Sequence, residues 1–381
     1  MPATLFFASA GLIAFAYFGY PLALAIAARL APKPIRRASF TPAVTIVVVA
    51  HNEEANIGAK IRSCLDQRYP PDRLRLLIAS DGSTDGMNAI VRNHGDARVR
   101  LLAFDQRRGK AACLNDALAA CEEDFVVLSD ARQPLDADAV AFLMENFADE
   151  SVGAVGGELR FRTEAASGFA EGIDAYWRYE KFIRQKESDI GSAVGVSGAL
   201  YALRRALWQP IPPQTILDDV LIPMNVAMQR KRVAFDARAV AWDRPSLSPA
   251  RERVRKVRTL AGNFQLIALR PALLAPGRNP LFAQFVCHKL LRLVVPLAMA
   301  LALVANAMLA RQGPFWSITL AAQLGCYGIA VAGLAVPSLC RRLPIRLLAT
   351  FLALNVFVVL GFASFAFNRN AHLWRTNRGA D

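Results

Sequence analysis

The stretch that decides the fold is residues 44–50, Val-Thr-Ile-Val-Val-Val-Ala, with His51-Asn52-Glu53-Glu54 directly after it. A β-branched run without polar alternation is typical of a strand buried on both faces of a parallel sheet. Similar runs alternate with helical patterns along the chain. Strands are predicted at 74–79, 99–103, 125–129 and 154–159, and helices at 53–67, 86–94, 111–121, 135–147, 176–188 and 218–229. Alternation with short connections predicts an α/β fold with a parallel sheet.

Polar side chains follow several of these strands. Asp81-Gly82-Ser83-Thr84-Asp85 comes after the second strand, and Asp130 comes after the fourth. Because parallel α/β sheets bind ligands beyond the carboxyl ends of their strands, we expect His51, Asp81 and Asp130 to border one pocket. Asp130 is also of the residue type that Mg²⁺ and Mn²⁺ prefer. Taken singly, the Asp81 motif is explained equally well as a helix cap, and a lone aspartate at a strand end, such as Asp130, is usually only a turn residue.

Apolar residues make up 54% of the 381 residues and gather near both ends of the chain. Residues 5–28, 293–310, 315–339 and 347–367 are each long and apolar enough to predict a membrane span. The first stretch lacks the basic leader of a cleaved signal peptide, so we expect it to stay as an anchor. Basic residues that follow an uncleaved anchor place the next segment in the cytoplasm. These residues are Arg29, Lys33, Arg36 and Arg37.

The net charge of +14 raises the question of a nucleic-acid partner. We see no recognition-helix pattern, aromatic RNA-binding box or zinc-ligand spacing, so no nucleic-acid partner is expected. Basic residues cluster beside the apolar stretches instead, as expected for contact with anionic lipid. The six cysteines include no Cys-x-x-Cys pair, which argues against a zinc site and against a disulfide framework.

Three later motifs carry charged or flexible residues. A glycine-rich turn within residues 195–204 leads into a strand, Asp218-Asp219 opens a helix, and Arg255-Lys256-Val257-Arg258 precedes the second apolar region. A carboxylate at a helix start is also a good cap, and a basic run next to a membrane also suits a solvated or lipid-facing surface. Arginine presents a bidentate fork to phosphate, which favours a ligand-binding role for Arg255 and Arg258.

In their order, these motifs resemble those of the family 2 glycosyltransferases, in particular the membrane-embedded branch with cellulose, hyaluronan and poly-N-acetylglucosamine synthases. The matching segments are Ala50-His-Asn-Glu-Glu54, Asp81-Gly-Ser-Thr-Asp85, Gly109-Lys-Ala-Ala-Cys-Leu-Asn115, Ser129-Asp-Ala131, Gly198-Ala-Leu-Tyr-Ala-Leu-Arg204 and Asp218-Asp219. The resemblance covers residues 44–265. It implies a GT-A fold, which is a Rossmann-like mixed sheet with helices on both faces. It also implies a nucleoside-diphosphate-sugar donor, commonly UDP-linked, with Mg²⁺ or Mn²⁺ as cofactor and inverting transfer.

The resemblance also implies roles for individual residues. The donor-binding positions are Ala50, Asn52, Glu53, Asp81, Ser83, Lys110 and Asp130, and Asp130 would also ligate the metal. The catalytic positions are Asp219 as general base, Asp218 beside it, and Arg255 and Arg258 at the donor diphosphate; Gly198 and Tyr201 would line the acceptor side. These roles agree with the chemistry, because a single displacement needs one carboxylate to accept the acceptor's proton. The departing diphosphate gains charge that a metal and arginines can stabilise.

Two positions depart from the family pattern. Arg132 stands where the metal motif often has a second aspartate, so Asp130 would be the only protein carboxylate on the ion. Thr259 stands where the polymer synthases have a tryptophan that stacks on the growing chain. Its absence argues against processive synthesis, and so does the prediction of only four spans.

The sequence therefore predicts an anchor in residues 1–35, a cytoplasmic GT-A domain in 36–265, and a membrane-surface segment with about three spans in 266–381. The expected activity is sugar transfer at the inner (plasma) membrane to a glycan or lipid-linked acceptor, in cell-envelope or exopolysaccharide synthesis. Transfer of one sugar to a membrane lipid and an inactive scaffold of the same fold are the alternatives. Export or accessory subunits stay undefined. A transporter is disfavoured because the predicted spans carry no charged residues.

Overall fold

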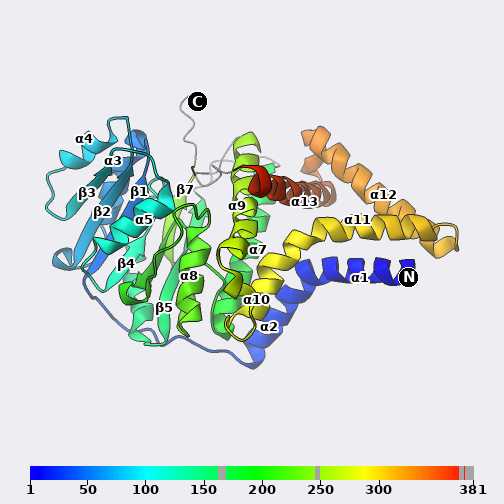
Figure 1. The fold of residues 1–381 in the computed structure, drawn as a ribbon, viewed down its shortest axis with the longest axis horizontal. Helices are drawn as coiled ribbons and strands as arrows, with labels where there is room; N and C mark the ends of the chain where they lie inside the picture. The colour runs from blue at the N-terminus through cyan, green and yellow to red at the C-terminus, as the bar shows by residue number, and fades with distance from the viewer. Residues whose placement is uncertain (162–168, 245–248, 369–372, 374–381) are drawn as a thin grey trace.

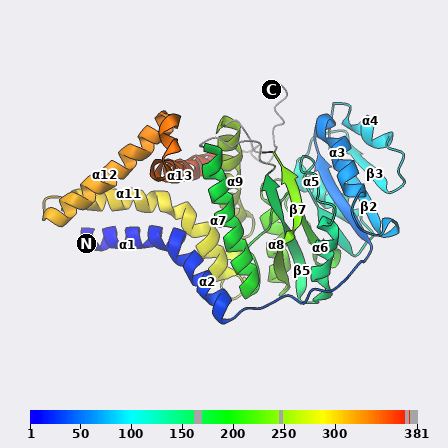
Figure 2. The same cartoon turned by 180° about the vertical axis from the view of Figure 1, so that it is seen from behind.

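The computed structural model describes residues 1–161, 169–244, 249–368 and 373. Figure 1 shows a sheet with its helices at one end of the molecule and a group of long helices at the other. Helices α7 (Phe169–Ile190) and α9 (Pro249–Leu269) stand between the two parts. Seen from behind in Figure 2, the connection after α2 (Tyr20–Leu30) runs along the base of the molecule to the sheet.

The sheet has seven strands in the order β3-β2-β1-β4-β6-β5-β7. The first four strands of the chain are parallel, β6 is antiparallel to both β4 and β5, and β5 is parallel to β7. The bounds are β1 (Val44–Ala50), β2 (Leu74–Asp81), β3 (Val99–Phe104), β4 (Phe125–Leu128), β5 (Val152–Phe161), β6 (Tyr201–Arg204) and β7 (Arg232–Asp243). The expected mixed α/β sheet is confirmed.

Helices on both faces of the sheet explain why β1 is apolar throughout. Val47 and Val49 pack with α5 (Lys110–Ala119) and α8 (Asp218–Met228). Ile46 and Val48 point to the other face. The helices there are α3 (Glu54–Leu65), α4 (Met87–Arg92) and α6 (Ala139–Glu145). Since every residue of β1 is buried, polar alternation would place charges in one of the two cores.

The structure contains a strand, β7, that the sequence pattern did not predict. Asp236 and Arg238 interrupt its apolar residues. Both charges are satisfied in the fold, because Arg238 pairs with Asp236 at 2.8 Å and Asn146 Nδ2 donates to the same carboxylate at 2.9 Å. The helix expected from residue 135 begins only at Ala139, since Leu135 forms a bridge with β7 instead.

Four helical segments of the described chain are long and apolar enough to cross a membrane, as expected. They are Pro2–Leu30, Phe282–Leu309, Pro314–Ala335 and Leu343–Phe367. The first segment consists of α1 (Pro2–Ala14), the π-helical turn Phe15–Gly19 and α2. The second consists of α10 (Phe282–Phe285), the π-helical turn Val286–Leu290 and α11 (Leu291–Leu309). The third and fourth segments are the single helices α12 and α13. Large apolar side chains such as Phe18, Leu297 and Ile318 are exposed on them. A lipid-facing surface has this character.

The second of these segments starts earlier than the predicted residue 293, and this corrects one expectation. His288, Lys289 and Arg292 lie inside it, so the spans do carry charged residues. Ahead of it, α9 runs on to Leu269 and is followed by the 3₁₀ turn Pro271–Leu274. The predicted domain boundary at residue 265 therefore falls inside a helix.

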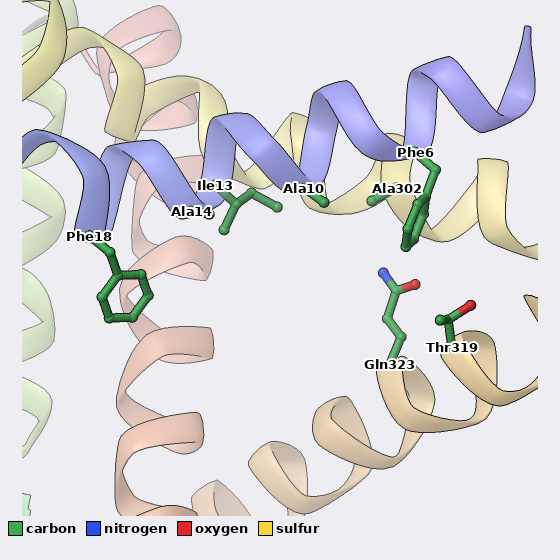
Figure 3. Close-up of a pocket in the computed structure, with 8 residues that line it drawn as sticks. All are labelled: Phe6, Ala10, Ile13, Ala14, Phe18, Ala302, Thr319 and Gln323. Carbon is green, nitrogen blue, oxygen red and sulfur yellow. The ribbon is translucent and has the colours of Figure 1, made fainter. Parts of the chain in front are cut away.

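A cavity of about 340 Å³ lies among α1, α11 and α12 (Figure 3). It is lined by Phe6, Ala10, Ile13, Ala14, Phe18 and Ala302, together with Thr319 and Gln323. The two polar side chains lie 3.0 and 3.1 Å from the side chain of Asn306. Because its lining holds no ionisable group, this cavity suits hydrocarbon chains better than sugar chemistry.

Candidate active site

Two strands of opposite direction bring an acidic motif and a glycine motif together. Tyr201, the first residue of β6, pairs with Leu128, the last residue of β4. Asp130 follows β4 and Gly198 precedes β6, so both lie at the same edge of the sheet. A Cβ atom on Gly198 would stand 3.7 Å from Asp130 Oδ2.

Lys110, in the first turn of α5, lies among three aspartates. Its Nζ donates to Asp130 Oδ1 at 2.8 Å and lies 3.1 Å from Asp218 Oδ2. The backbone N–H of Gly198 donates to Asp219 Oδ2 at 3.2 Å. These five residues, Lys110, Asp130, Gly198, Asp218 and Asp219, are called the acidic cluster below. Their motifs predict donor, acceptor and catalytic roles for these residues, and the fold places them side by side.

Electrostatics within the acidic cluster separate the protonation states of its members. Burial and the charge of Asp218 raise the pKa of Asp219 to about 6, while Lys110 opposes that rise. Burial by itself lowers the pKa of Lys110, but attraction to Asp130 and Asp218 outweighs it and the pKa lies above its usual value. At neutral pH the arrangement therefore offers a carboxylate base beside a fixed cation.

Arg258 and Arg255 differ in their surroundings, although they lie one turn apart on α9. Burial lowers the pKa of Arg258, and the three aspartates of the acidic cluster oppose this. Arg255 pairs with Glu252 at 2.7 Å. The expected contact of each arginine with a donor diphosphate stays a prediction, and Arg258 has the better placement for it.

Tyr201, expected on the acceptor side, is fully buried beneath the acidic cluster. Burial and the charges of Asp218, Asp219 and Asp130 raise the pKa of its hydroxyl well above the usual value. Within the described part of the chain this hydroxyl makes no hydrogen bond. The hydroxyl therefore stays protonated at neutral pH.

The turns after β1 and β2 are tied to each other. Asn52, with φ 54°, donates its N–H to Ser83 Oγ at 3.1 Å, and its side-chain Oδ1 accepts from the Thr84 N–H at 2.8 Å. His51 Nδ1 donates to the Asp81 carbonyl at 2.6 Å. Ala50 is the buried last residue of β1. The donor-binding residues predicted in these two turns thus form one continuous edge, and their roles stay predictions.

The Asp81 carboxylate is fully buried and accepts bonds from the chain itself. The N–H groups of Arg108 and Gly109 donate to it at 2.6 and 3.0 Å. Gly109 has φ 94° and caps α5, so Asp81 fixes the point at which α5 begins. In this geometry the Asp81 carboxylate fixes the backbone directly ahead of Lys110. Direct donor contact by Asp81, as expected from the sequence, stays a prediction.

Among the described residues, no group of three or more His, Cys, Asp or Glu side chains could hold a metal ion by itself. Asp130 Oδ1 accepts from Lys110, whereas Oδ2 faces the space beside Gly198, and the side chain is 41% exposed. Arg132, which replaces the second aspartate of the metal motif, lies 3.6 Å from Glu53. One carboxylate together with phosphate oxygens and water is a common way to hold Mg²⁺, so the residues fit an ion that arrives with a diphosphate.

Lys60 is a positioning residue that the sequence analysis missed. Its fully buried Nζ donates to Ser129 Oγ and to the Gln133 carbonyl, both at 2.6 Å. Ser129 Oγ in turn donates to the Ala199 carbonyl at 2.5 Å. Lys60 therefore holds both ends of the loop that carries Asp130 and links it to the strand start beside Gly198. Nothing in the helical pattern of residues 53–67 distinguishes this lysine from a solvated one.

Comparison with known proteins agrees with this geometry. Residues 45–209 match the family model described as Glycosyl transferase family 2. This part of the chain is therefore similar to family 2 glycosyltransferase domains. Lys110, Asp130 and Gly198 lie within the matched residues, and Asp218 and Asp219 follow shortly after the end of the match. The resemblance inferred from the motifs is confirmed.

Curated relatives share the glycosyltransferase domain over about half of this chain. The β-monoglucosyldiacylglycerol synthase of Synechocystis sp. is 27% identical over 204 residues, which are 51% of this chain and 42% of that protein. The poly-β-1,6-N-acetyl-D-glucosamine synthase of Staphylococcus epidermidis is 23% identical over 208 residues, or 52% and 49%. This chain thus spans less than half the length of the relatives it matches.

One solved structure is similar over nearly the whole chain, membrane helices included. It is the mannosyltransferase PcManGT of Pyrobaculum calidifontis, determined in complex with GDP-Man and Mn²⁺. The TM-score is 0.72 at 25% sequence identity, and the match covers 96% of this chain and 99% of that one. The GT-A architecture expected from the sequence is therefore confirmed.

Proposed function

We propose that the protein is a membrane-bound inverting glycosyltransferase that moves a sugar from a nucleoside-diphosphate sugar to a glycan or lipid-linked acceptor. The observation that carries the proposal is the acidic cluster: a carboxylate with a pKa of about 6, Asp219, stands beside the cation Lys110 and the exposed carboxylate Asp130. A base, a cation and a metal ligand are the parts that inverting transfer from a diphosphate requires.

In the proposed reaction, Asp219 accepts the proton of the acceptor hydroxyl as its oxygen bonds to the anomeric carbon of the donor. The bond from that carbon to the diphosphate breaks on the opposite face, so the configuration inverts. The electron pair leaves with the nucleoside diphosphate, whose growing charge Lys110 and Arg258 stabilise. Gly198 leaves room above Asp219, because any side chain there would stand within 4 Å of the reacting groups.

Asp130 would hold a Mg²⁺ or Mn²⁺ ion through Oδ2. A divalent ion bound there would neutralise charge on the diphosphate. The Mn²⁺ in the PcManGT complex supports this assignment. The single carboxylate implies that most of the ion's ligands come from the donor and water.

The proposal also concerns the nucleotide of the sugar donor and the class of acceptor. The motif resemblance favours a UDP-linked sugar, whereas the similar PcManGT structure holds GDP-Man. The two curated relatives are named for a glycolipid product and for a polysaccharide product. A lipid-linked acceptor suits this chain better, since Thr259 is not the aromatic platform that a growing polymer would stack on.

The basic residues near the first membrane helix bear on which side of the membrane the glycosyltransferase domain lies. Arg29 lies in the last turn of the first membrane helix, and Lys33 and Arg37 follow shortly after its end. Because basic residues are enriched on the cytoplasmic side of membrane proteins, these residues support a cytoplasmic glycosyltransferase domain at the inner (plasma) membrane. A role in cell-envelope or exopolysaccharide synthesis fits a cytoplasmic donor and an acceptor at the bilayer.

Membranes that contain the protein, incubated with Mn²⁺ and a panel of UDP- and GDP-linked sugars, test the proposal. Consumption of one donor, with a sugar-bearing lipid or glycan identified by mass spectrometry, is the expected result. Addition of EDTA is expected to stop it. If no donor is consumed above the level of membranes without the protein, the proposed activity is refuted and an inactive scaffold is the better description.

A further inference from the structure

The proposed base, Asp219, is held by a segment outside its own helix. Its backbone carbonyl lies at the start of α8, and the residue four positions later is Pro223. Because proline has no N–H, this carbonyl lacks its usual partner within the helix. The Val196 N–H donates to it instead at 3.0 Å, and the Gly198 N–H donates to the Asp219 carboxylate at 3.2 Å. The position of the base therefore depends on residues 194–198, called the base-holding segment below.

The base-holding segment packs closely against the start of α8. Gly195 has φ 137°, a conformation that favours glycine, and a Cβ atom there would stand 3.5 Å from the Asp219 carbonyl oxygen. Directly before the segment, the Ala193 N–H donates to the Val233 carbonyl of β7 at 2.9 Å. The start of the segment is thus attached to the sheet, and its end holds the base.

A carboxylate on α7 holds the base-holding segment at its first residue. Glu187 is fully buried, and its Oε2 accepts the Val194 N–H at 3.1 Å. Its Oε1 accepts from the Tyr20 hydroxyl at 2.6 Å and lies 2.9 Å from His288 Nδ1. Burial by itself raises the pKa of Glu187, but His288 and the bonds from Tyr20 and Val194 outweigh it, and the pKa lies below its usual value. The ionised carboxylate is therefore fixed by these three groups.

Two of the three groups belong to membrane helices. Tyr20 is the first residue of α2, and His288 lies near the start of the second membrane span. Since α7 stands between the sheet and the membrane helices (Figure 1), Glu187 contacts both parts of the molecule. A continuous series of contacts thus runs from the membrane helices through Glu187 and the base-holding segment to Asp219.

We propose that Glu187 is a positioning residue for the base, and that Tyr20 and His288 make the placement of Asp219 depend on how the membrane helices pack against α7. This rests on the proposed function, and it adds a residue that acts through the base-holding segment. A misplacement of reacting groups by about 1 Å can cost roughly a hundredfold in rate. Donor binding is expected to be unaffected, because the predicted nucleotide contacts belong to the turns after β1 and β2.

The test replaces Glu187 by leucine in the full chain and measures the single-turnover rate of sugar transfer. The rate is divided by the number of UDP- or GDP-binding sites in the sample, so that unfolded molecules do not count. We expect the rate per site to fall at least about tenfold in Glu187→Leu, with unchanged nucleotide affinity. Glu187→Gln should restore it to within about threefold of the wild type, because the amide oxygen can accept the Val194 N–H and the NH₂ group can donate to Tyr20 or His288.

Glu180→Leu is the matched control. Glu180 lies two turns earlier on the same face of α7, is buried, and contacts the same His288 at 3.1 Å. Its other partner is Arg292, whereas that of Glu187 is the base-holding segment. The substitution removes a comparable buried carboxylate, so it is expected to lower stability while the rate per site matches the wild type.

Where Glu187→Leu binds no nucleotide, two milder variants decide. Tyr20→Phe removes a hydroxyl that donates to Glu187, and Tyr179→Phe removes one that donates to the Tyr17 carbonyl at 2.9 Å. Only Tyr20→Phe is expected to lower the rate per site, by about threefold. Equal rates in these two variants would overturn the inference.

Equal rates per site in Glu187→Leu and Glu180→Leu would also overturn the inference, and so would a Glu187→Gln rate as low as that of Glu187→Leu. If the wild type transfers sugar and these comparisons fail, only this inference is lost. If the wild type uses no donor at all, the proposed function fails. Hydrogen–deuterium exchange at the Val196 and Gly198 amides then decides the positioning: faster exchange is expected in Glu187→Leu than in Glu180→Leu, and equal exchange would refute it.

Discussion

Replacing Lys110 by methionine is expected to move the acid limb of the pH–rate profile upward. Burial and Asp218 raise the pKa of Asp219 to about 6, and Lys110 holds it down. A Cβ atom on Gly198 would stand 3.5 Å from Asp219 Oδ2 and 3.6 Å from Lys110 Nζ. The two charged atoms are therefore within about 7 Å of each other, where unit charges at an effective dielectric constant of about 20 interact by about 2.4 kcal/mol.

The sign follows from the protonation state that the reaction needs. A general base works as the carboxylate, so the rate falls as the pH drops through the pKa of Asp219. Without the ammonium of Lys110 the carboxylate loses about 2.4 kcal/mol of stabilisation, which is about 1.7 pKa units. The limb is expected near pH 6 in the wild type and between about pH 7 and about pH 8 in the variant.

The measurement is the initial rate of sugar transfer at saturating donor across this pH range. The pH at which the rate is half-maximal gives the position of the acid limb, even if the substitution also lowers the maximal rate. Lys181→Met is the matched control, because that ammonium pairs with Glu158 at 2.6 Å and not with the acidic cluster. Its limb is expected to coincide with that of the wild type. A Lys110→Met limb that stays at the wild-type position would refute the electrostatic account of Asp219.

Three further predictions concern the surroundings of the base. Gly198→Ala places a methyl group in ordinary contact with Asp219 and Lys110. This variant should fold normally but lower kcat/KM for the acceptor roughly a hundredfold. The control Gly277→Ala, which has open space around the new methyl group, should match the wild type. Asp130→Asn should lower kcat by roughly two orders of magnitude without rescue by added Mn²⁺, and full rescue would argue against metal binding there. Lys60→Met frees the loop that carries Asp130, so the Mn²⁺ concentration for half-maximal rate should rise roughly tenfold; an unchanged metal requirement would mean that Lys60 is only structural.

The parts of the fold predicted well from the sequence are those with one dominant signal. The bounds of β1 and the presence of four membrane spans follow from long apolar runs. β7 was missed because its charges, Asp236 and Arg238, are neutralised by partners that only the fold brings near. The second span was placed too late because Lys289 and Arg292 lie in its first turns. Both differences depend on contacts between segments that are distant in the sequence, and the local sequence pattern does not contain this information.

The residues of the candidate site were predicted better than their geometry. Motif order indicated Asp130, Gly198 and Asp219, but the reversed direction of β6 is what brings the first two together. Arg255 and Arg258 are equivalent as sequence, yet the packing of α9 turns only Arg258 towards the acidic cluster. Lys60 shows the same limit, since its burial depends on the loop after β4.

The central claim is that Asp219 is the base of a glycosyl transfer, and Asp219→Asn tests it most directly. The amide keeps the size of the side chain and can still accept the Gly198 N–H, but it cannot take up a proton. The measurement is the single-turnover rate of sugar transfer to the acceptor found with the donor panel, alongside nucleotide affinity. We predict that transfer falls by roughly a thousandfold or more while the nucleoside diphosphate binds as in the wild type. Wild-type transfer by Asp219→Asn would contradict the account.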